Sequence, residues 1–150
     1  MNVGGDVLDK YRNVELRPWQ KKVLDEFMQL NDDEILHVVI EWEGGAGKGF
    51  LMKYMEANRI AKAIPQDCVL EACTANPSDR YVIRLARATD QSERRLWHTI
   101  EQIKKGQYEE TNNSCPKILV LSALEPPCGV RSEGMWKTMV FEKDGTHKLK

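Results

Sequence analysis

The clearest helical pattern in the chain lies at residues 16–30, where apolar side chains recur every three or four positions. Trp19, Val23 and Phe27 define one apolar face, and charged residues occupy the opposite face. Pro18 falls in the first turn, where its missing N–H removes no helical hydrogen bond. The segment is therefore predicted to be an amphipathic helix that packs on a core and carries no chemistry of its own.

Strand patterns alternate with further helical patterns along the rest of the chain. Helices are predicted from the glycine-rich segment to about residue 63, and from Asp90, as an N-cap, to Lys105. Strands are predicted from short apolar runs, at 35–40, 68–74, 81–86, 117–121 and 136–141. This alternation predicts an α/β fold, a three-layer sandwich with a mostly parallel central sheet. The glycine-rich segment then follows the carboxyl end of a strand, where such sheets bind ligands.

Length, charge and cysteine usage set limits on this fold and its partners. The 150 residues suit one domain at 16–142, with a polar lead-in at 1–15 and a flexible tail at 143–150. A net charge of −1 provides no global positive field, so contact with nucleic acid would need a local basic patch. Four widely spaced cysteines favour free thiols and an intracellular chain. No apolar run reaches membrane-spanning length, so no membrane partner is expected.

A glycine-rich segment after the first predicted strand carries the strongest chemical signal. Strand, glycine loop, lysine and helix form the layout of a phosphate-binding loop, because inward N–H groups and the positive helix end hold phosphates. Lys48 is the candidate catalytic residue, since it would stabilise charge on a transferred phosphoryl group. An ordinary glycine turn leading into a helix is the alternative. The candidate nucleotide-binding residues are Gly44, Gly45, Ala46, Gly47, Lys48, Gly49 and Phe50.

Two positions depart from the full phosphate-loop pattern. Trp42 stands where a glycine is expected, and Gly49 stands where a Ser or Thr hydroxyl normally holds Mg²⁺. The missing hydroxyl removes a metal ligand but leaves the backbone donors of the loop. The expected ligand is therefore a nucleoside triphosphate, ATP or GTP, while the case for Mg²⁺ is weakened.

Several short motifs occur in an order that is similar to a known protein family. They are LRPWQ at 16–20, EGGAGKG at 43–49, IEQIKKG at 100–106, KILVLSALEPP at 117–127 and SEGMW at 132–136. Together they resemble the helicase domain of replication initiator (Rep) proteins from circovirus-like single-stranded DNA viruses. The resemblance implies a superfamily 3, P-loop NTPase-like fold and a ring-shaped homo-oligomer that hydrolyses ATP around single-stranded DNA. For a viral protein it also implies the host nucleus.

The resemblance further implies roles for single residues. Lys48 matches the lysine of the phosphate loop, and Lys104 and Lys105 lie in a stretch similar to the DNA-contacting motif of the family. The Walker B aspartate falls on Arg84 and the polar sensor residue falls on Ala123, so the resemblance to a metal-handling site is lost at both positions. Two roles are open for Arg84: pairing with phosphates in place of a metal, or facing solvent from a strand edge.

These residues leave two main functions open. One is a nucleotide-binding, helicase-derived domain of a viral or virus-derived protein of DNA replication. The loss of residues that would bind a metal ion argues against hydrolysis by this domain. The other is a non-catalytic oligomerising or DNA-binding scaffold from a captured viral gene, and a decaying gene copy is a third interpretation. His37, His98 and His147 are too far apart for the paired histidines of a nicking endonuclease, so that activity is not expected here.

Overall fold

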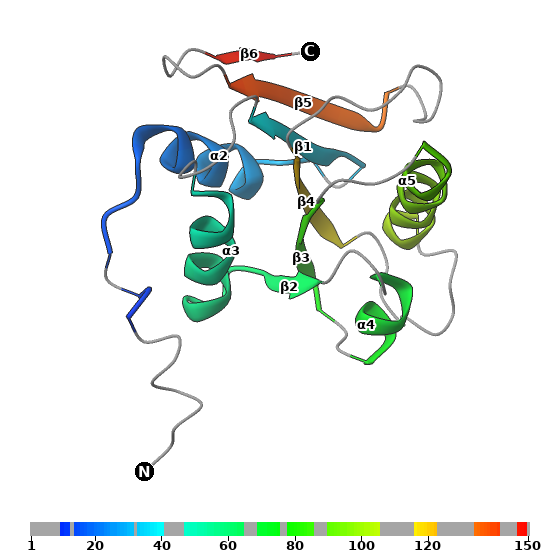
Figure 1. Ribbon diagram of the computed structural model, residues 1–150, viewed down its shortest axis with the longest axis horizontal. Helices are drawn as coiled ribbons and strands as arrows, with labels where there is room; N and C mark the ends of the chain where they lie inside the picture. Colours follow the sequence, from blue (N-terminus) through cyan, green and yellow to red (C-terminus); the bar gives the residue numbers. More distant parts are fainter. Residues whose placement is uncertain are drawn as a thin grey trace.

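A six-stranded sheet forms the centre of the described structure (Figure 1). Its strands lie in the order β2-β3-β4-β1-β5-β6. The first five strands in this order are parallel to their neighbours, and β6 pairs antiparallel with β5. The predicted α/β fold with a mostly parallel sheet is thus confirmed, and part of the predicted tail contributes β6. The strands are β1 (Ile35–Ile40), β2 (Lys62–Ile64), β3 (Arg80–Arg84), β4 (Lys117–Ser122), β5 (Trp136–Phe141) and β6 (His147–Leu149). The computed structural model describes residues 10–12, 14–31, 33–40, 47–64, 69–75, 78–85, 90–105, 116–122, 134–141 and 147–149.

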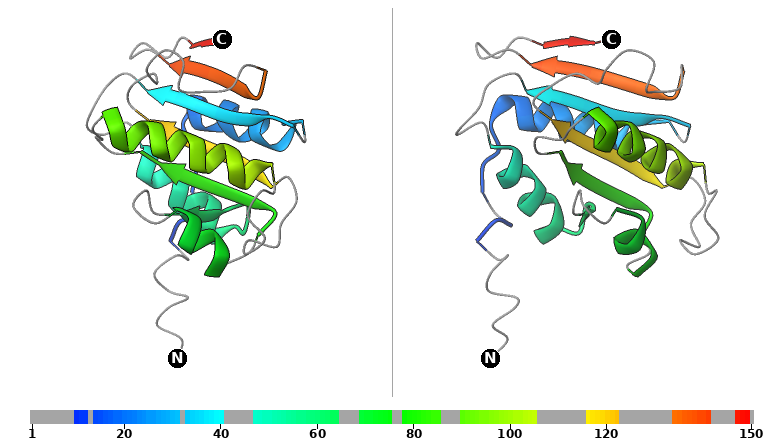
Figure 2. Two further views of the ribbon diagram at one scale, coloured as in Figure 1. Left: turned by 90° about the vertical axis from the view of Figure 1, so that its right-hand side faces the viewer. Right: turned by 45° about the vertical axis from the view of Figure 1, so that its right-hand side comes forward.

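Helices cover both faces of this sheet. In the described segments, α2 (Pro18–Met28) and α3 (Lys48–Ala57) lie on one face, and α4 (Val69–Ala75) and α5 (Asp90–Lys104) lie on the other (Figure 1). Figure 2 shows the same three layers from the side of α5, which crosses the sheet in front of β1 and β4. None of the helices in these segments is both long and apolar enough to cross a bilayer.

Alternating side chains of the strands form two separate hydrophobic cores, because successive residues of a strand point to opposite faces. Leu36, Val38 and Ile40 of β1 are buried in one cluster with Val23 and Phe27 of α2. The intervening positions face α4 and α5. The main members of that second cluster are Ile35, Tyr81, Ile83, Leu96, Trp97, Ile100, Ile118 and Val120.

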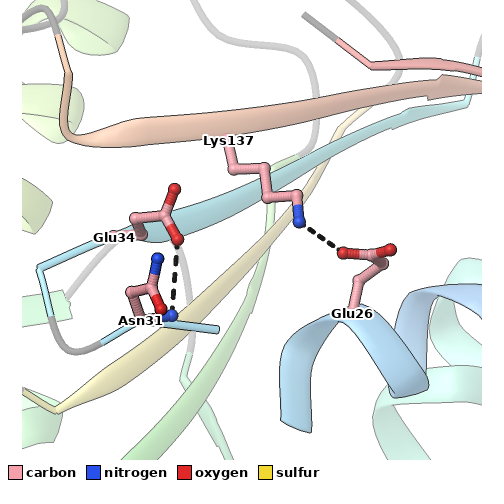
Figure 3. Close-up of polar contacts among 4 residues, drawn as sticks. All are labelled: Glu26, Asn31, Glu34 and Lys137. Carbon is pink, nitrogen blue, oxygen red and sulfur yellow. Dashed lines mark hydrogen bonds and ion pairs between the residues drawn. The ribbon is translucent and has the colours of Figure 1, made fainter. Parts of the chain in front are cut away.

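Polar contacts fix α2 and the turn that follows it (Figure 3). Lys137 Nζ, near the start of β5, donates to Glu26 Oε2 of α2 at 2.5 Å. In the turn between α2 and β1, the N–H of Asn31 donates to Glu34 Oε1 at 3.3 Å. The C-terminal half of α2 therefore lies near the amino ends of the strands, and its first turn lies near their carboxyl ends.

Helix α3 is shorter than predicted, because its last turn is closed by a left-handed residue. The helix ends at Ala57, and Arg59 adopts a φ of 56°. The N–H of Ile60 then donates to the carbonyl oxygen of Met55 at 2.8 Å, a bond that terminates helices. Since glycine usually provides this left-handed stop, an arginine in the position gives no visible stop signal in the sequence. Residues 62–64 consequently form β2 instead of continuing the helix.

The strand predicted at 68–74 is wrong, because this segment contains helix α4. Val69 and Cys73 are buried, whereas Glu71 and Ala75 are exposed. Residues four apart share one face of a helix, while residues two apart share one face of a strand. A strand would therefore have placed Glu71 on the same buried face as its two apolar neighbours.

Candidate functional site

The two middle strands of the sheet, β1 and β4, are parallel, and the connections that follow them lead to opposite sides of the sheet. After β1 the chain continues through α3 to β2, beyond β4 and β3, whereas after β4 it continues to β5 on the other side of β1. Open parallel sheets bind ligands where neighbouring connections diverge in this way, outside the carboxyl ends of the strands. β1 ends at Ile40 and α3 begins at Lys48, and the glycine-rich segment lies between them in the sequence. Its members Gly44, Gly45 and Ala46 lie outside the described residues, and Gly47, Lys48, Gly49 and Phe50 lie within them.

Gly47, directly before α3, occupies a position that favours glycine. Its φ of 93° lies in the left-handed region, which costs glycine little and strains other residues. A Cβ at this position would also lie 2.7 Å from Gln20 Nε2 of α2, so the glutamine side chain would have to move. The same Nε2 donates to the carbonyl oxygen of Gly47 at 3.0 Å. A substitution would therefore strain the backbone and disturb the contact with Gln20.

Gln20 joins the first turns of α2 and α3, although the helical pattern alone gives it no such role. Its side chain is 1% exposed, and its Oε1 accepts a hydrogen bond from the N–H of Arg17 at 2.8 Å. Its Nε2 makes the bond to Gly47. The signal available in the sequence is its spacing: Gln20 lies three residues before Val23 and seven before Phe27, so it is a polar residue on the apolar face.

Positive charge gathers around the first turn of α3. Lys48 is the first residue of this helix and is half-buried. Arg17 Nη1 lies 3.7 Å from the place that a Cβ of Gly47 would take. The first hydrogen bond within α3 runs from the N–H of Leu51 to the carbonyl oxygen of Gly47, so this turn is the positive end of the helix dipole. These cations and this end of the dipole favour an anion.

Arg84, the last residue of β3, points at the same turn from the sheet. Val82 is buried in the α2/α3 core, and Arg84, two residues further on, shares that face. Its Nη1 lies 3.1 Å from the place that a Cβ of Gly49 would take. Arg84 thus lies next to the turn at Gly49 and is exposed to solvent, so both roles that the sequence left open are compatible with its position.

The residues at this turn do not fit Mg²⁺, the metal that the family resemblance implies. Protein sites for Mg²⁺ use oxygen ligands, usually including one or two carboxylates. Gly49 has no side chain, and Arg84 provides a cation where the resemblance expects a carboxylate. Across the described segments, no group of three or more His, Cys, Asp or Glu side chains could hold a metal ion.

Phe50, the last of the candidate nucleotide-binding residues, packs against the residues that precede α2. Its ring meets Tyr11 edge-to-face, with centroids 5.4 Å apart. Lys10 and Lys53 place their ammonium groups 5.2 and 5.8 Å from the Tyr11 centroid. Phe50 therefore holds residues 10–12 against α3.

The two lysines predicted to contact nucleic acid differ in burial. Lys104 is 2% exposed, and its Nζ donates to the carbonyl oxygen of Pro116 at 2.8 Å. Lys105 is exposed. Only Lys105 of the pair is therefore accessible to nucleic acid in this conformation. Both residues lie at the end of α5, beside the amino end of β4. Lys48 lies at the other end of the strands, where their carboxyl ends are.

A buried polar pair lies beneath α5. His37 Nε2 of β1 and Ser122 Oγ of β4 are 2.7 Å apart. The His37 ring meets Trp97 and Trp136 edge-to-face, with centroids 4.9 and 6.2 Å away. The pair is thus enclosed by aromatic side chains and has a structural role. The adjacent sensor position, Ala123, lies outside the described residues.

A cavity of about 480 Å³ lies at the amino ends of β2 and β3, away from the turn of α3. Its lining includes charges of both signs, so it has no clear preference for an anion. The charged residues in this lining are Glu56, Arg59, Lys62, Asp79 and Arg80.

Comparison of the chain with known proteins adds no relative. No family model, no curated protein and no solved structure matches it. The similarity to Rep helicases therefore rests on the sequence motifs and stays a prediction. The residues around Gly47, Lys48 and Arg84 carry the functional proposal.

Proposed function

We propose that the chain is a P-loop NTPase-like domain that binds a nucleoside triphosphate at the first turn of α3, and that it derives from a helicase of DNA replication. The observation that carries the proposal is the approach of Arg17 and Arg84 to the turn that begins with Gly47 and Lys48. With Lys48, these cations come from three places in the fold: the N-cap of α2, the first turn of α3 and the end of β3. Three cations and a helix N-terminus suit the charge of a triphosphate.

Phosphate binding explains this turn better than a purely connecting role does. A connection needs neither a left-handed glycine held by a buried amide nor cations contributed by two other elements. A binding site needs both, because its donors must be fixed before the ligand arrives. The bond from Gln20 Nε2 to Gly47 provides that fixation.

The same residues favour binding over hydrolysis. In P-loop enzymes Mg²⁺ neutralises charge that develops on the transferred phosphoryl group, and its protein ligands come from the loop hydroxyl and the Walker B aspartate. Gly49 and Arg84 provide neither ligand. This observation supports a second candidate function, a non-catalytic oligomerising or DNA-binding scaffold.

A nucleotide titration of the full chain tests the proposal. Lys48→Ala is expected to weaken binding of a fluorescent ATP analogue by about tenfold or more, because a charged contact to phosphate is lost. Lys53→Ala is the matched control, since Lys53 is an exposed lysine of the same helix, and it should leave affinity within about twofold. Absence of saturable binding, or an equal loss in both variants, contradicts the proposal.

Two further measurements define the ligand and the activity. Inorganic tripolyphosphate should compete with the ATP analogue, whereas adenosine should not, because the proposed contacts are made to phosphate. Turnover of ATP in the presence of single-stranded DNA should not exceed that of Lys48→Ala. A higher rate in the unmodified chain would remove the scaffold alternative and show that catalysis survives without the usual metal ligands.

A further inference from the structure

We infer that the guanidinium of Arg84 takes the place of the divalent cation, so that this site binds a metal-free triphosphate and Mg²⁺ weakens that binding. The inference rests on the proposed function, because it concerns the same site, and it adds the form in which the ligand binds. The observation behind it is that Gly49 and Arg84 provide no oxygen ligand for Mg²⁺.

The two departures at this turn are sterically compatible. Arg84 Nη1 lies 3.1 Å from the place of a Cβ on Gly49, which is tighter than an ordinary van der Waals contact. A side chain at this position would require the guanidinium to shift by a few tenths of an ångström, whereas glycine leaves the guanidinium where it is. The glycine and the arginine are therefore compatible neighbours at this turn.

The direction of Arg84 is set by the sheet. Arg84 is level with Leu121 of β4, and the N–H of Leu85 donates to the carbonyl oxygen of Leu121 at 2.7 Å. Pairing therefore continues to the very end of β3 and fixes its backbone. Because Val82 is buried on the α3 side, the side chain of Arg84 must emerge on that side as well.

A guanidinium is chemically suited to replace a metal on phosphate oxygens. It is planar and permanently charged, and its N–H groups form a fork that matches two phosphate oxygens. Arg17, the N-cap of α2, and Lys48, the first residue of α3, add positive charge near the same turn. A Mg²⁺ ion on the triphosphate would occupy oxygens that this fork needs and would repel Arg84. Mg²⁺ is therefore expected to act as a competitor here, the opposite of the role that the family resemblance implies.

The test is the affinity of the full chain for ATP, measured by isothermal titration calorimetry in EDTA and in millimolar Mg²⁺. We expect tighter binding in EDTA and several-fold weaker binding with Mg²⁺. Binding that requires Mg²⁺ overturns this inference and leaves the proposed function in place. Absence of binding under both conditions overturns both, so the two failures are distinguishable.

Single substitutions identify the group responsible. In EDTA, Arg84→Ala should lose about tenfold in affinity, and Arg84→Lys should lose less, because a point charge keeps the attraction but not the fork. Arg95→Ala is the matched control, since Arg95 is an exposed arginine of α5 on the other face of the sheet. Thermal unfolding followed by circular dichroism checks that each variant is folded. Equal affinities of Arg84→Ala and the unmodified chain in EDTA overturn the inference.

A double variant tests the metal effect directly. Gly49→Thr combined with Arg84→Asp rebuilds the hydroxyl and carboxylate ligands that Mg²⁺ uses in phosphate loops. In this variant Mg²⁺ should strengthen ATP binding, which reverses the sign of its effect. If Mg²⁺ still weakens binding by the same factor, the competition does not involve Arg84 and the inference is wrong.

Discussion

The two faces of the sheet use their polar side chains differently. On the α2/α3 face, polar contacts converge on one turn at the carboxyl edge, where Gln20 holds Gly47 and Arg84 faces the start of α3. On the α4/α5 face, the His37–Ser122 pair is satisfied inside an aromatic core. One face therefore carries cations at the site proposed to bind a nucleotide, and the other face buries its polar pair in the core. This division predicts that substitutions on the two faces will affect different measurements.

The largest effect is expected from Trp97 on the α4/α5 face. Trp97 is 2% exposed, and its ring lies 5.1 Å from that of Trp136 and 4.9 Å from that of His37, measured between centroids. Trp97→Ala should lower the free energy of unfolding by about 3–5 kcal/mol, because it leaves a large cavity. Urea denaturation followed by circular dichroism measures this loss. The folded fraction of the variant should bind ATP with unchanged affinity, and a matching loss of affinity would break the proposed division.

A smaller effect on stability, accompanied by an effect on binding, is expected from Gln20 on the α2/α3 face. Gln20→Leu keeps the size of the side chain but removes its bonds to Arg17 and Gly47, which should cost about 1–3 kcal/mol of unfolding free energy. ATP affinity should fall as well, because Gly47 is no longer held. Lys22→Ala, an exposed change on α2, is the control for both measurements. Lower stability with unchanged affinity would show that the turn keeps its shape without the hydrogen bonds of Gln20.

The smallest expected effect is a pH dependence of stability from Cys73 of α4. Burial raises the pKa of this thiol from 9.0 to about 12, against a smaller lowering by a hydrogen bond with Tyr81. The folded chain keeps the thiol proton where the unfolded chain releases it, so stability is full below pH 9.0 and falls as pH rises toward 12. One pH unit above 9.0 the loss is about 1.4 kcal/mol.

Comparison with Cys73→Ala isolates this contribution. Urea midpoints of the two proteins, measured on both sides of the ordinary thiol pKa, should converge as the solution becomes more alkaline. The variant loses core packing at every pH but lacks the thiol-dependent slope, and its ATP affinity should not change. Parallel pH profiles would mean that the thiol ionises equally easily in the folded and unfolded chains.

The elements that could be predicted from sequence are those whose pattern is complete within one segment. The strand expected at 136–141 is observed as Trp136–Phe141, and the helix expected from Asp90 to Lys105 is observed as Asp90–Lys104. Both carry enough apolar residues to define their period. The end of α3 escapes prediction, because it depends on a left-handed conformation of Arg59 that no local rule assigns to arginine.

The candidate site was predictable in part for the same physical reason. The spacing of Gly47 and Lys48 after an apolar strand is local information, and the side on which Arg84 emerges follows from its distance to Val82. The role of Gln20 depends on Gly47, which lies 27 positions away, and the burial of Lys104 depends on the carbonyl group of Pro116. Contacts of this kind exist only once the sheet has brought separate segments together.

The two outermost strands of the sheet affect how copies of the chain can associate. Within the described strands, β2 and β6 have three residues each, and β2 carries Lys62 in an exposed position. Short edge strands and an exposed lysine discourage an incoming strand from pairing at a sheet border. Continuous sheets shared between molecules are therefore disfavoured. A ring of copies, such as the Rep resemblance implies, is expected to form through helices and loops.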